Sequence, residues 1–121
     1  MNEIERRKPV WKALSEFYLD TELQELDFNY ISSLLIASNY PLEELKKFDR
    51  YEVFPLLHSN LLSVAGEWAE FDEEWLYARC ERFYQKRFSV RHRILYLLLN
   101  VFLYKMRKAY WTEIEKRIKL S

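Results

Sequence analysis

The side chains of this sequence that could do chemistry are two histidines, one cysteine and nineteen Asp and Glu residues. His58 and His92 lie far apart, and neither falls in a His-x-x-x-His or Glu-x-x-His pattern, so their spacing does not indicate a zinc or di-iron site. Cys80 falls on the inward side of its predicted helix, where a thiol is normally buried and unreactive. With a single glycine, the chain also lacks a phosphate-binding glycine loop. We therefore predict a protein that is not an enzyme and that needs no metal or cofactor.

The carboxylates are densest between Glu67 and Glu74. Part of this cluster has a structural explanation, because the helix dipole favours acidic residues at a helix start by about 0.3–1 kcal/mol each. The functional explanation is an acidic docking surface, whose internal repulsion is tolerated because it speeds encounter with a basic partner. Both explanations stay open. The candidate partner-binding carboxylates are Asp20, Glu22, Glu25, Asp27, Glu67, Glu70 and Asp72.

Charge is unevenly distributed, although the 19 basic and 19 acidic residues cancel. No Lys or Arg lies between Lys12 and Lys46 or between Arg50 and Arg79, whereas the chain beyond Arg79 is mostly basic. That basic part makes nucleic-acid binding an alternative function. No helix-turn-helix glycine turn, RNA-binding aromatic motif or zinc finger accompanies it, and pairing between acidic and basic helices is the commoner arrangement. The residues that would form a basic stripe are Arg87, Arg91, Lys105 and Lys108.

The composition predicts an all-α fold, because one glycine and three prolines leave few residues for the tight turns of a many-stranded protein. Helix-start and helix-stop residues divide the chain into about six helices. These signals are Pro9 at the first position of the first helix, a Thr21-Glu-Leu-Gln24 capping box, Pro41, a break at Val53–Phe54 before Pro55, a cap at Gly66, and N-caps at Asp72 and Ser89.

We expect the fold to be organised around the stretch from Ser89 to Leu120. Its block Ile94–Tyr104 has no charge, glycine or proline, and so predicts a helix that is apolar on every side. Other helices must enclose such a helix, which is too short to cross a bilayer, since crossing takes about 20 residues. We therefore predict a single compact domain of about six helices packed around a long, hydrophobic C-terminal helix. The end of that helix is expected to project, which makes Trp111 a candidate partner contact.

The length of the chain places residues 1–121 in one domain, which would bury about two-thirds of its unfolded surface. A single cysteine excludes an internal disulfide and suits a reducing cytoplasm. The first eight residues carry charge where a signal peptide needs an apolar stretch. We therefore expect a cytoplasmic protein that does not bind membranes.

Three stretches carry a resemblance to a known family: Pro9-Val-Trp-Lys-Ala-Leu-Ser15, Leu19-Asp-Thr-Glu-Leu23 and Asn60-Leu-Leu-Ser-Val-Ala-Gly-Glu-Trp-Ala-Glu-Phe-Asp72. With them the chain resembles a family of small bacterial proteins that is catalogued as a domain of unknown function. The resemblance covers about residues 6–77 and leaves the basic C-terminal helix outside. It implies a bacterial origin and an all-helical fold, and it supplies no catalytic residue and no substrate.

These observations favour a protein-binding module, most concretely an immunity protein that occludes a basic nuclease toxin with its acidic surface. The reasons are a small single domain, no assembled chemistry and segregated carboxylates. The first alternative is a nucleic-acid-binding or regulatory accessory protein that uses the basic C-terminal helix. The second is a structural homodimer formed through the exposed end of that helix.

Overall fold

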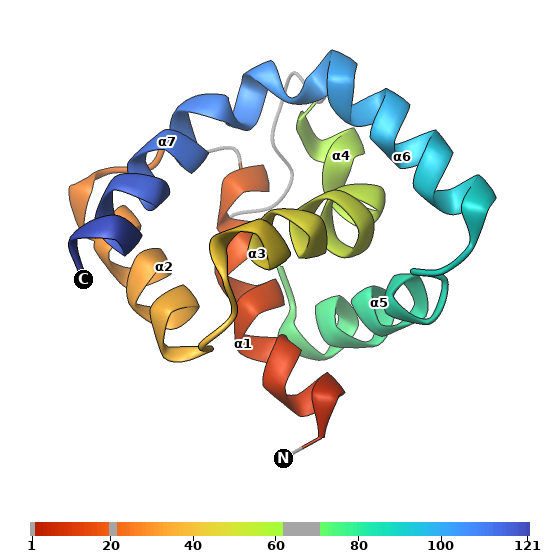
Figure 1. Cartoon of the computed structure of the whole chain (residues 1–121), viewed down its shortest axis with the longest axis horizontal. Helices are drawn as coiled ribbons and strands as arrows, with labels where there is room; N and C mark the ends of the chain where they lie inside the picture. Colours follow the sequence, from red (N-terminus) through yellow and green to blue (C-terminus); the bar gives the residue numbers. More distant parts are fainter. Residues whose placement is uncertain (1, 20–21, 62–70) are drawn as a thin grey trace.

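The helix α1 (Glu3–Ser15) runs through the middle of the molecule in a computed structural model that describes residues 2–19, 22–61 and 71–121 (Figure 1). Val10, Trp11 and Leu14 of α1 have no exposed surface. The 3-10 turn η1 (Glu16–Tyr18) continues the helix and adds two buried aromatic rings. The wide apolar side of this run packs against several other helices at once, so α1 is the central helix of the fold.

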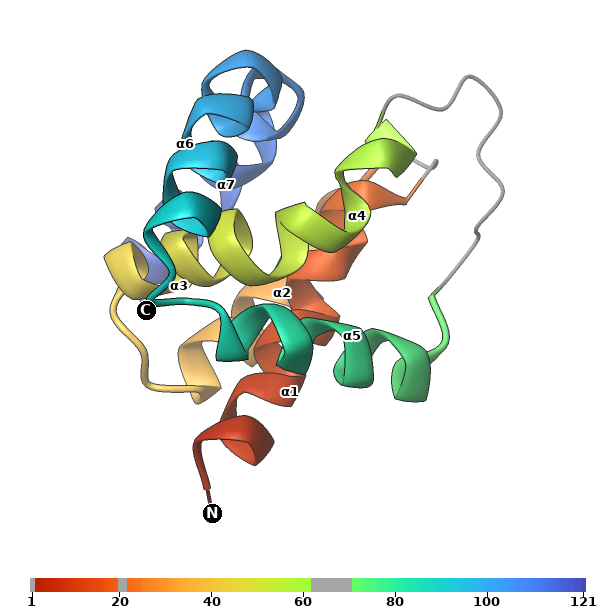
Figure 2. The same ribbon diagram turned by 90° about the vertical axis from the view of Figure 1, so that its right-hand side faces the viewer.

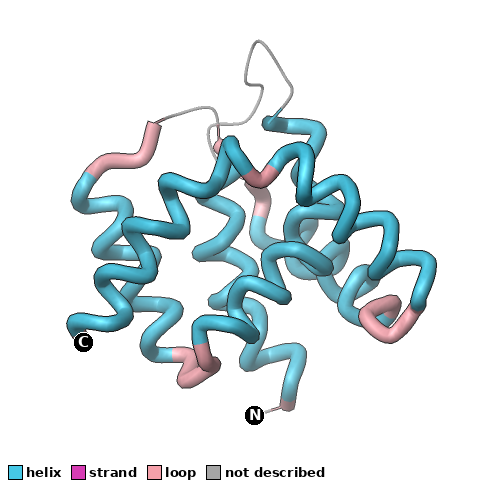
Figure 3. Tube along the Cα trace, turned by 45° about the horizontal axis from the view of Figure 1, so that its top comes forward, coloured by secondary structure: helices cyan, strands magenta, loops and turns pink. Residues whose placement is uncertain are grey.

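The other helices surround α1. α2 (Glu25–Ala37) and α5 (Glu73–Gln85) lie on either side of it, and α7 (Lys105–Leu120) packs against α2 (Figure 1). α3 (Leu42–Phe48), the π-helix η2 (Asp49–Val53) and α4 (Phe54–Leu61) follow one another without a loop. α6 (Val90–Leu103) and α7 form an arch over that run (Figure 1), and Figure 2 shows the same two helices nearly end-on, with α6 in front of α7. The described residues contain helices and loops but no strand (Figure 3), which confirms the predicted compact all-α domain.

Two of the predicted helix starts are confirmed by their hydrogen bonds. The Asp72 carboxylate accepts the backbone N–H of Trp75 at 2.9 Å, and the Ser89 hydroxyl accepts that of His92 at 3.4 Å. Both are N-cap contacts, which satisfy N–H groups that have no partner inside the helix. The predicted cap at Gly66 lies outside the described residues.

Two other helix starts differ from the prediction. α2 is capped by Gln24, whose backbone N–H donates to the Asp27 carboxylate at 2.8 Å, so the helix begins after the predicted Thr21–Gln24 box. The assignment of Pro9 to the first helical position is wrong, because α1 begins at Glu3 and Pro9 lies inside it. The side chain of Asn2 caps α1, and the helix continues through Pro9 without the hydrogen bond that its missing N–H would have made.

The predicted break at Val53–Phe54 is wrong, because the chain stays helical there and widens into a π-turn. The Phe54 N–H donates to the Asp49 carbonyl five residues back. In an α-helix the Tyr51 carbonyl would accept from residue 55, which is a proline without an N–H. The Nε2 of His92 lies 2.8 Å from that carbonyl and so takes the place of the missing donor. This bond ties α6 to η2.

α6 lies on the surface of the domain, so the prediction of a buried central helix over Ile94–Tyr104 is wrong. The buried residues of α6 are the polar His92 and Asn100, at 8% and 7% exposure, whereas Phe102 is 78% exposed. In a helix that is apolar on every side, the sequence pattern does not indicate which side is buried. In α6, the hydrogen bonds of His92 and Asn100 decide which side faces the core. The stretch Ser89–Leu120 is also two helices rather than one. None of the described helices has both the length and the hydropathy of a bilayer-crossing segment.

Candidate functional site

An exposed apolar surface follows the outer side of α6. We call it the α6 face, and its members are Val90, Ile94, Leu95, Leu97, Leu98, Val101 and Phe102. Their exposed fractions run from 44% at Leu97 to 78% at Phe102. Phe88 just before the helix and Met106 just after it are also exposed. A contiguous apolar surface of this kind marks a binding site in a soluble protein.

The α6 face has the residue spacing of a helix–helix contact. One row along the helix has spacings of four, three and four residues, and a second row beside it has spacings of three and four. The first row is Val90, Ile94, Leu97 and Val101, and the second is Leu95, Leu98 and Phe102. Because a helix rises about 1.5 Å per residue, the two rows offer a partner helix a track of roughly 20 Å.

Positive charge borders the α6 face at both ends. Arg91 lies at its start, Lys105 and Lys108 follow its end, and all three are exposed. Within the described ranges none of the three forms an ion pair. The sequence has no acidic residue between Glu81 and Glu113 that could neutralise them locally. Arg117 near the end of α7 differs, because two carboxylates lie 2.7 and 2.9 Å from its guanidinium. The charge around the α6 face is therefore available to a partner.

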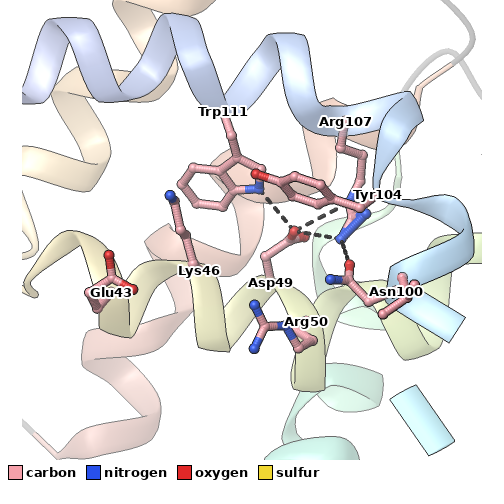
Figure 4. Close-up of a pocket in the computed structure, with 9 residues that line it drawn as sticks. Glu43, Lys46, Asp49, Arg50, Asn100, Tyr104, Arg107 and Trp111 are labelled. Atoms are coloured by element: carbon pink, nitrogen blue, oxygen red, sulfur yellow. Dashed lines mark hydrogen bonds and ion pairs between the residues drawn. The ribbon is translucent and has the colours of Figure 1, made fainter. Parts of the chain in front are cut away.

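Beneath the C-terminal end of α6, the carboxylate of Asp49 is the centre of a buried hydrogen-bond network (Figure 4). Asp49 is 1% exposed and accepts from the Tyr18 hydroxyl at 2.5 Å, the Trp111 indole at 3.1 Å and the Arg107 guanidinium at 3.1 Å. Arg107, also 1% exposed, donates to the Asn100 side-chain oxygen at 2.5 Å. The network joins η1, η2, α6 and α7, so it fixes the bend between α6 and α7.

The protonation states in this network are set by burial and by the neighbouring charge. Burial acts against the charged guanidinium, but the charges and hydrogen bonds of Asp49 and Tyr18 together outweigh it and raise the pKa of Arg107 above its ordinary value. Burial, together with the charge of Asp49, raises the pKa of the Tyr18 hydroxyl well above its ordinary value. Neither shift brings a pKa toward neutrality, where a general acid or base works. The network is therefore suited to holding structure rather than to proton transfer.

A second buried carboxylate, Glu52, lies three residues further along η2. It is 2% exposed and accepts from the Trp11 indole at 2.8 Å and the Arg7 guanidinium at 2.5 Å. Arg7 also pairs with Glu3 at 2.8 Å. Burial raises the pKa of Glu52, and the charge of Arg7 opposes that effect only in part. Through these bonds η2 is held against the central helix α1.

Two hollows lie beside these carboxylates, one toward each end of α6. The Asp49 hollow, of about 390 Å³, lies at the C-terminal end of α6, and the Glu52 hollow, of about 260 Å³, lies at its N-terminal end. The charged lining of the Asp49 hollow is Glu43, Lys46, Asp49, Arg50 and Arg107. The charged lining of the Glu52 hollow is Arg7, Glu44, Lys47, Glu52, Arg87 and Arg93. Three cations against two anions, and four against two, leave both hollows formally positive.

The predicted acidic docking surface is described only in part, because Asp20, Glu67 and Glu70 lie outside the described residues. Asp27 and Asp72 are engaged in helix caps, and Glu25 pairs with Arg117. The start of α2 and the start of α5 belong to helices on opposite sides of α1 (Figure 1), so these two groups do not form one patch. The described members, all exposed, are Glu22, Glu25, Asp27 and Asp72.

Trp111 is buried, so its predicted role as a surface contact is wrong. It is 2% exposed, its indole donates to Asp49, and the ring of Phe17 meets it edge-on at 5.3 Å between centroids. Ile114, one turn later, has no exposed surface. The end of the chain therefore does not project as expected, because α7 lies along α2.

The other chemistry-bearing side chains have structural partners. Cys80 is fully buried, as predicted, and burial raises the pKa of its thiol well above its ordinary value. The Nδ1 of His58 lies 3.0 Å from the Phe54 carbonyl within its own helix. In the part of the chain that the structure describes, no three His, Cys, Asp or Glu side chains gather as they would around a metal ion.

Sequence reasoning missed the buried carboxylates of η2 and their cationic partners. The available signal was the sequence Phe48-Asp-Arg-Tyr-Glu-Val-Phe54, in which Asp49 and Glu52 are interleaved with large apolar residues. Buried indoles also need a hydrogen-bond acceptor, and the sequence contains four tryptophans. The pairing of Asp49 with Arg107 spans 58 residues and has no local signature.

Comparison with known proteins adds the family of the chain. No curated protein and no solved structure matches it. The model of one family matches residues 5–117. This match confirms the resemblance to a family of unknown function and extends it beyond residue 77, through α6 and into α7. The chain belongs to the family of the domain of unknown function DUF7079.

Proposed function

We propose that this protein is a non-enzymatic protein-binding module and that the α6 face is its binding surface. The observation that carries the proposal is the exposure of α6: its only buried residues are the polar His92 and Asn100, while seven apolar side chains on its outer side face water. Fully burying such a side chain contributes about 1.5–3 kcal/mol. Covering the roughly half-exposed α6 face would therefore contribute about 5–10 kcal/mol, before the cost of association.

The charges beside the α6 face specify the chemistry of the partner. Arg91 at one end and Lys105 and Lys108 at the other favour a partner surface that is apolar in the middle and carries carboxylates at its ends. A second copy of this chain fits less well. Two α6 helices that cross through this face bring basic end against basic end, whether they run parallel or antiparallel.

A bilayer also fits less well than a protein. The basic ends would attract anionic headgroups as they attract carboxylates, so charge alone does not separate a bilayer from a protein. Discrete hollows at fixed positions match side chains at fixed positions, which a protein partner supplies and a fluid lipid layer does not.

Site-specific photo-crosslinking tests the proposal. A benzophenone side chain replaces Leu98 in the α6 face, or exposed Arg79 on α5 as the matched control, and cells of the native host are irradiated. The proposal predicts an adduct of one defined mass from position 98 and not from position 79. The purified adduct partner should then bind the wild-type chain and bind Leu98→Asp at least tenfold more weakly.

Three results would overturn this proposal. The first is formation of the same adducts from positions 98 and 79, because that result would indicate random collision rather than specific docking. The second is an adduct of exactly two copies of this chain, which assigns the α6 face to a homodimer. The third is flotation of the pure protein with vesicles of anionic lipid that is lost in Leu98→Asp, which assigns the face to a membrane.

A second candidate function is neutralisation of a basic toxin in a bacterial host by the acidic residues. The observation that favours it is the exposure of Glu22, Asp72 and Glu74, which have no Lys or Arg partner among the described residues. Charge-assisted hydrogen bonds to Lys and Arg would occlude the toxin. With a purified candidate toxin, Glu67→Lys combined with Glu70→Lys should slow association and reduce its salt dependence. Association that is independent of salt and of this double reversal would rule this function out.

A further inference from the structure

We infer that the Asp49 and Glu52 hollows each receive one carboxylate side chain, Asp or Glu, from the partner that covers the α6 face. This inference rests on the proposed function and adds two specific anchor points to it. The hollows are well placed for this role, because α6 supplies part of the lining of both. Arg93 comes from the start of the helix, and Asn100, Val101 and Tyr104 come from its end.

In the Asp49 hollow, the cations are not matched by the anions. Asp49 is already occupied by three donors, as described above. Arg107 keeps a buried Nη1, and Arg50 keeps a buried Nε, with no hydrogen-bond partner among the described residues. Lys46 at the same hollow forms no ion pair within the described ranges (Figure 4). An incoming carboxylate would balance this charge.

In the Glu52 hollow, two of the four basic side chains form no ion pair with a described carboxylate. Lys47 pairs with Glu44 at 3.6 Å and Arg7 pairs with Glu52. Within the part of the chain that the structure describes, the remaining cations, Arg87 and Arg93, donate to backbone carbonyls alone, at 2.9 and 3.0 Å. Two guanidinium groups with free N–H donors are suited to bidentate binding of a carboxylate.

In the Asp49 hollow, the charge balance favours a carboxylate over a phosphate. The Asp49 hollow has one positive charge in excess, which a monoanion cancels and a dianion overcompensates. Its walls also include Val101 and the rings of Tyr104 and Trp111, which suit the short apolar stem of Asp or Glu. Residue 93 of α6 and residues 100–104 at its C-terminal end are seven to eleven positions apart, about 10–17 Å along the helix. A partner helix should therefore carry two acidic residues about two to three turns apart with apolar residues between them.

The probe for the test is acetate, which carries the same carboxylate group as the side chain of Asp. The uniformly ¹⁵N-labelled full chain is titrated with sodium acetate, with neutral acetamide, and with sodium chloride at equal ionic strength. The reporters are the Trp111 indole N–H beside the Asp49 hollow and the Arg93 Nε–H in the Glu52 hollow. Both signals should move along a saturating curve with acetate alone. In Lys46→Met with Arg50→Met, the shift of the Trp111 signal should fall at least fivefold, whereas Lys119→Met on α7 should leave it unchanged.

Failure of this inference can be separated from failure of the proposed function. If acetate moves neither reporter while position 98 still gives its adduct, the hollows are not carboxylate sites and the α6 face remains a docking surface. If phosphate at equal ionic strength produces the larger saturable shift, the assignment to a carboxylate is overturned. Against the purified partner, Lys46→Met with Arg50→Met should weaken binding about tenfold or more, and an unchanged affinity would also refute the inference.

Discussion

Replacement of Asp49 by asparagine tests whether the buried network holds the α6–α7 arch in place. Asparagine keeps the size of the side chain but removes its charge. One of its two acceptor oxygens becomes an NH₂ group that faces the donors of Tyr18, Trp111 or Arg107. Arg107, 1% exposed, is then a buried cation without a counterion. Breaking a buried ion pair in this way typically costs about 3–5 kcal/mol.

That loss is large for a chain of this size. At about 0.05–0.15 kcal/mol per residue, the whole protein is stabilised by roughly 6–18 kcal/mol. A loss of 3–5 kcal/mol should lower the melting temperature by about 10–20 °C. Urea unfolding followed by circular dichroism measures the change, and an unchanged m value would show that the compactness of the two states is preserved. Glu115→Gln, which breaks the surface Lys119–Glu115 pair, is the matched control and should leave the free energy of unfolding nearly unchanged.

A double-mutant cycle with Arg107→Met separates the ion pair from simple loss of packing. Each single variant leaves one buried charge unpaired, whereas the double variant leaves none of this pair. The double variant should therefore lose at least about 2 kcal/mol less than the sum of the single losses. If Asp49→Asn costs less than about 1 kcal/mol, or if the two effects add, the pair does not hold the arch and the reasoning fails.

Three further predictions rest on burial. The Cys80 thiol, buried and with a raised pKa, should react with a disulfide reagent at least about 1,000-fold more slowly in the native than in the unfolded protein, and equal rates would contradict its burial. Burial and the hydrogen bond to Glu3 raise the pKa of the Tyr40 hydroxyl to about 12. The native state therefore keeps this proton at a pH at which the unfolded state has already released it. The free energy of unfolding should therefore fall as pH rises from 10 to 12, and Tyr40→Phe should flatten that fall in urea titrations; an unchanged slope would contradict it. Leu98→Asp should change the free energy of unfolding by less than about 1 kcal/mol, whereas Leu35→Asp in the core should prevent folding; a severe loss from Leu98→Asp would mean that α6 is buried after all.

The local features of the fold could be predicted from the sequence, and the tertiary placement could not. The N-caps at Asp72 and Ser89 were predictable because a cap is decided by residues three positions apart. The position of α6 was not, because its apolar residues surround the helix and the pattern names no inward side. Trp111 was misplaced because its burial depends on Asp49, 62 residues away.

The candidate site was harder to predict than the fold for a similar reason. The basic residues around α6 were recognised from the sequence as a group. The exposed apolar face that separates them was not predicted, because the exposure of a helix depends on which other helices pack against it. The two hollows depend on α3 and η2 lying under α6, which no spacing in the sequence specifies.

The π-turn of η2 constrains the number of residues in this segment more strictly than it constrains their types. A π-turn contains one more residue than the α-helical turn that it replaces. Deleting a single residue from Asp49–Val53 would restore ordinary winding and leave α3 and α4 nearly in their present register, but it would change the directions of the side chains inside the segment. Asp49 and Glu52 could then no longer both reach their arginines, and the Tyr51 carbonyl would move away from His92. Homologous chains should therefore tolerate exchanges of apolar side chains in this segment while keeping its residue count invariant.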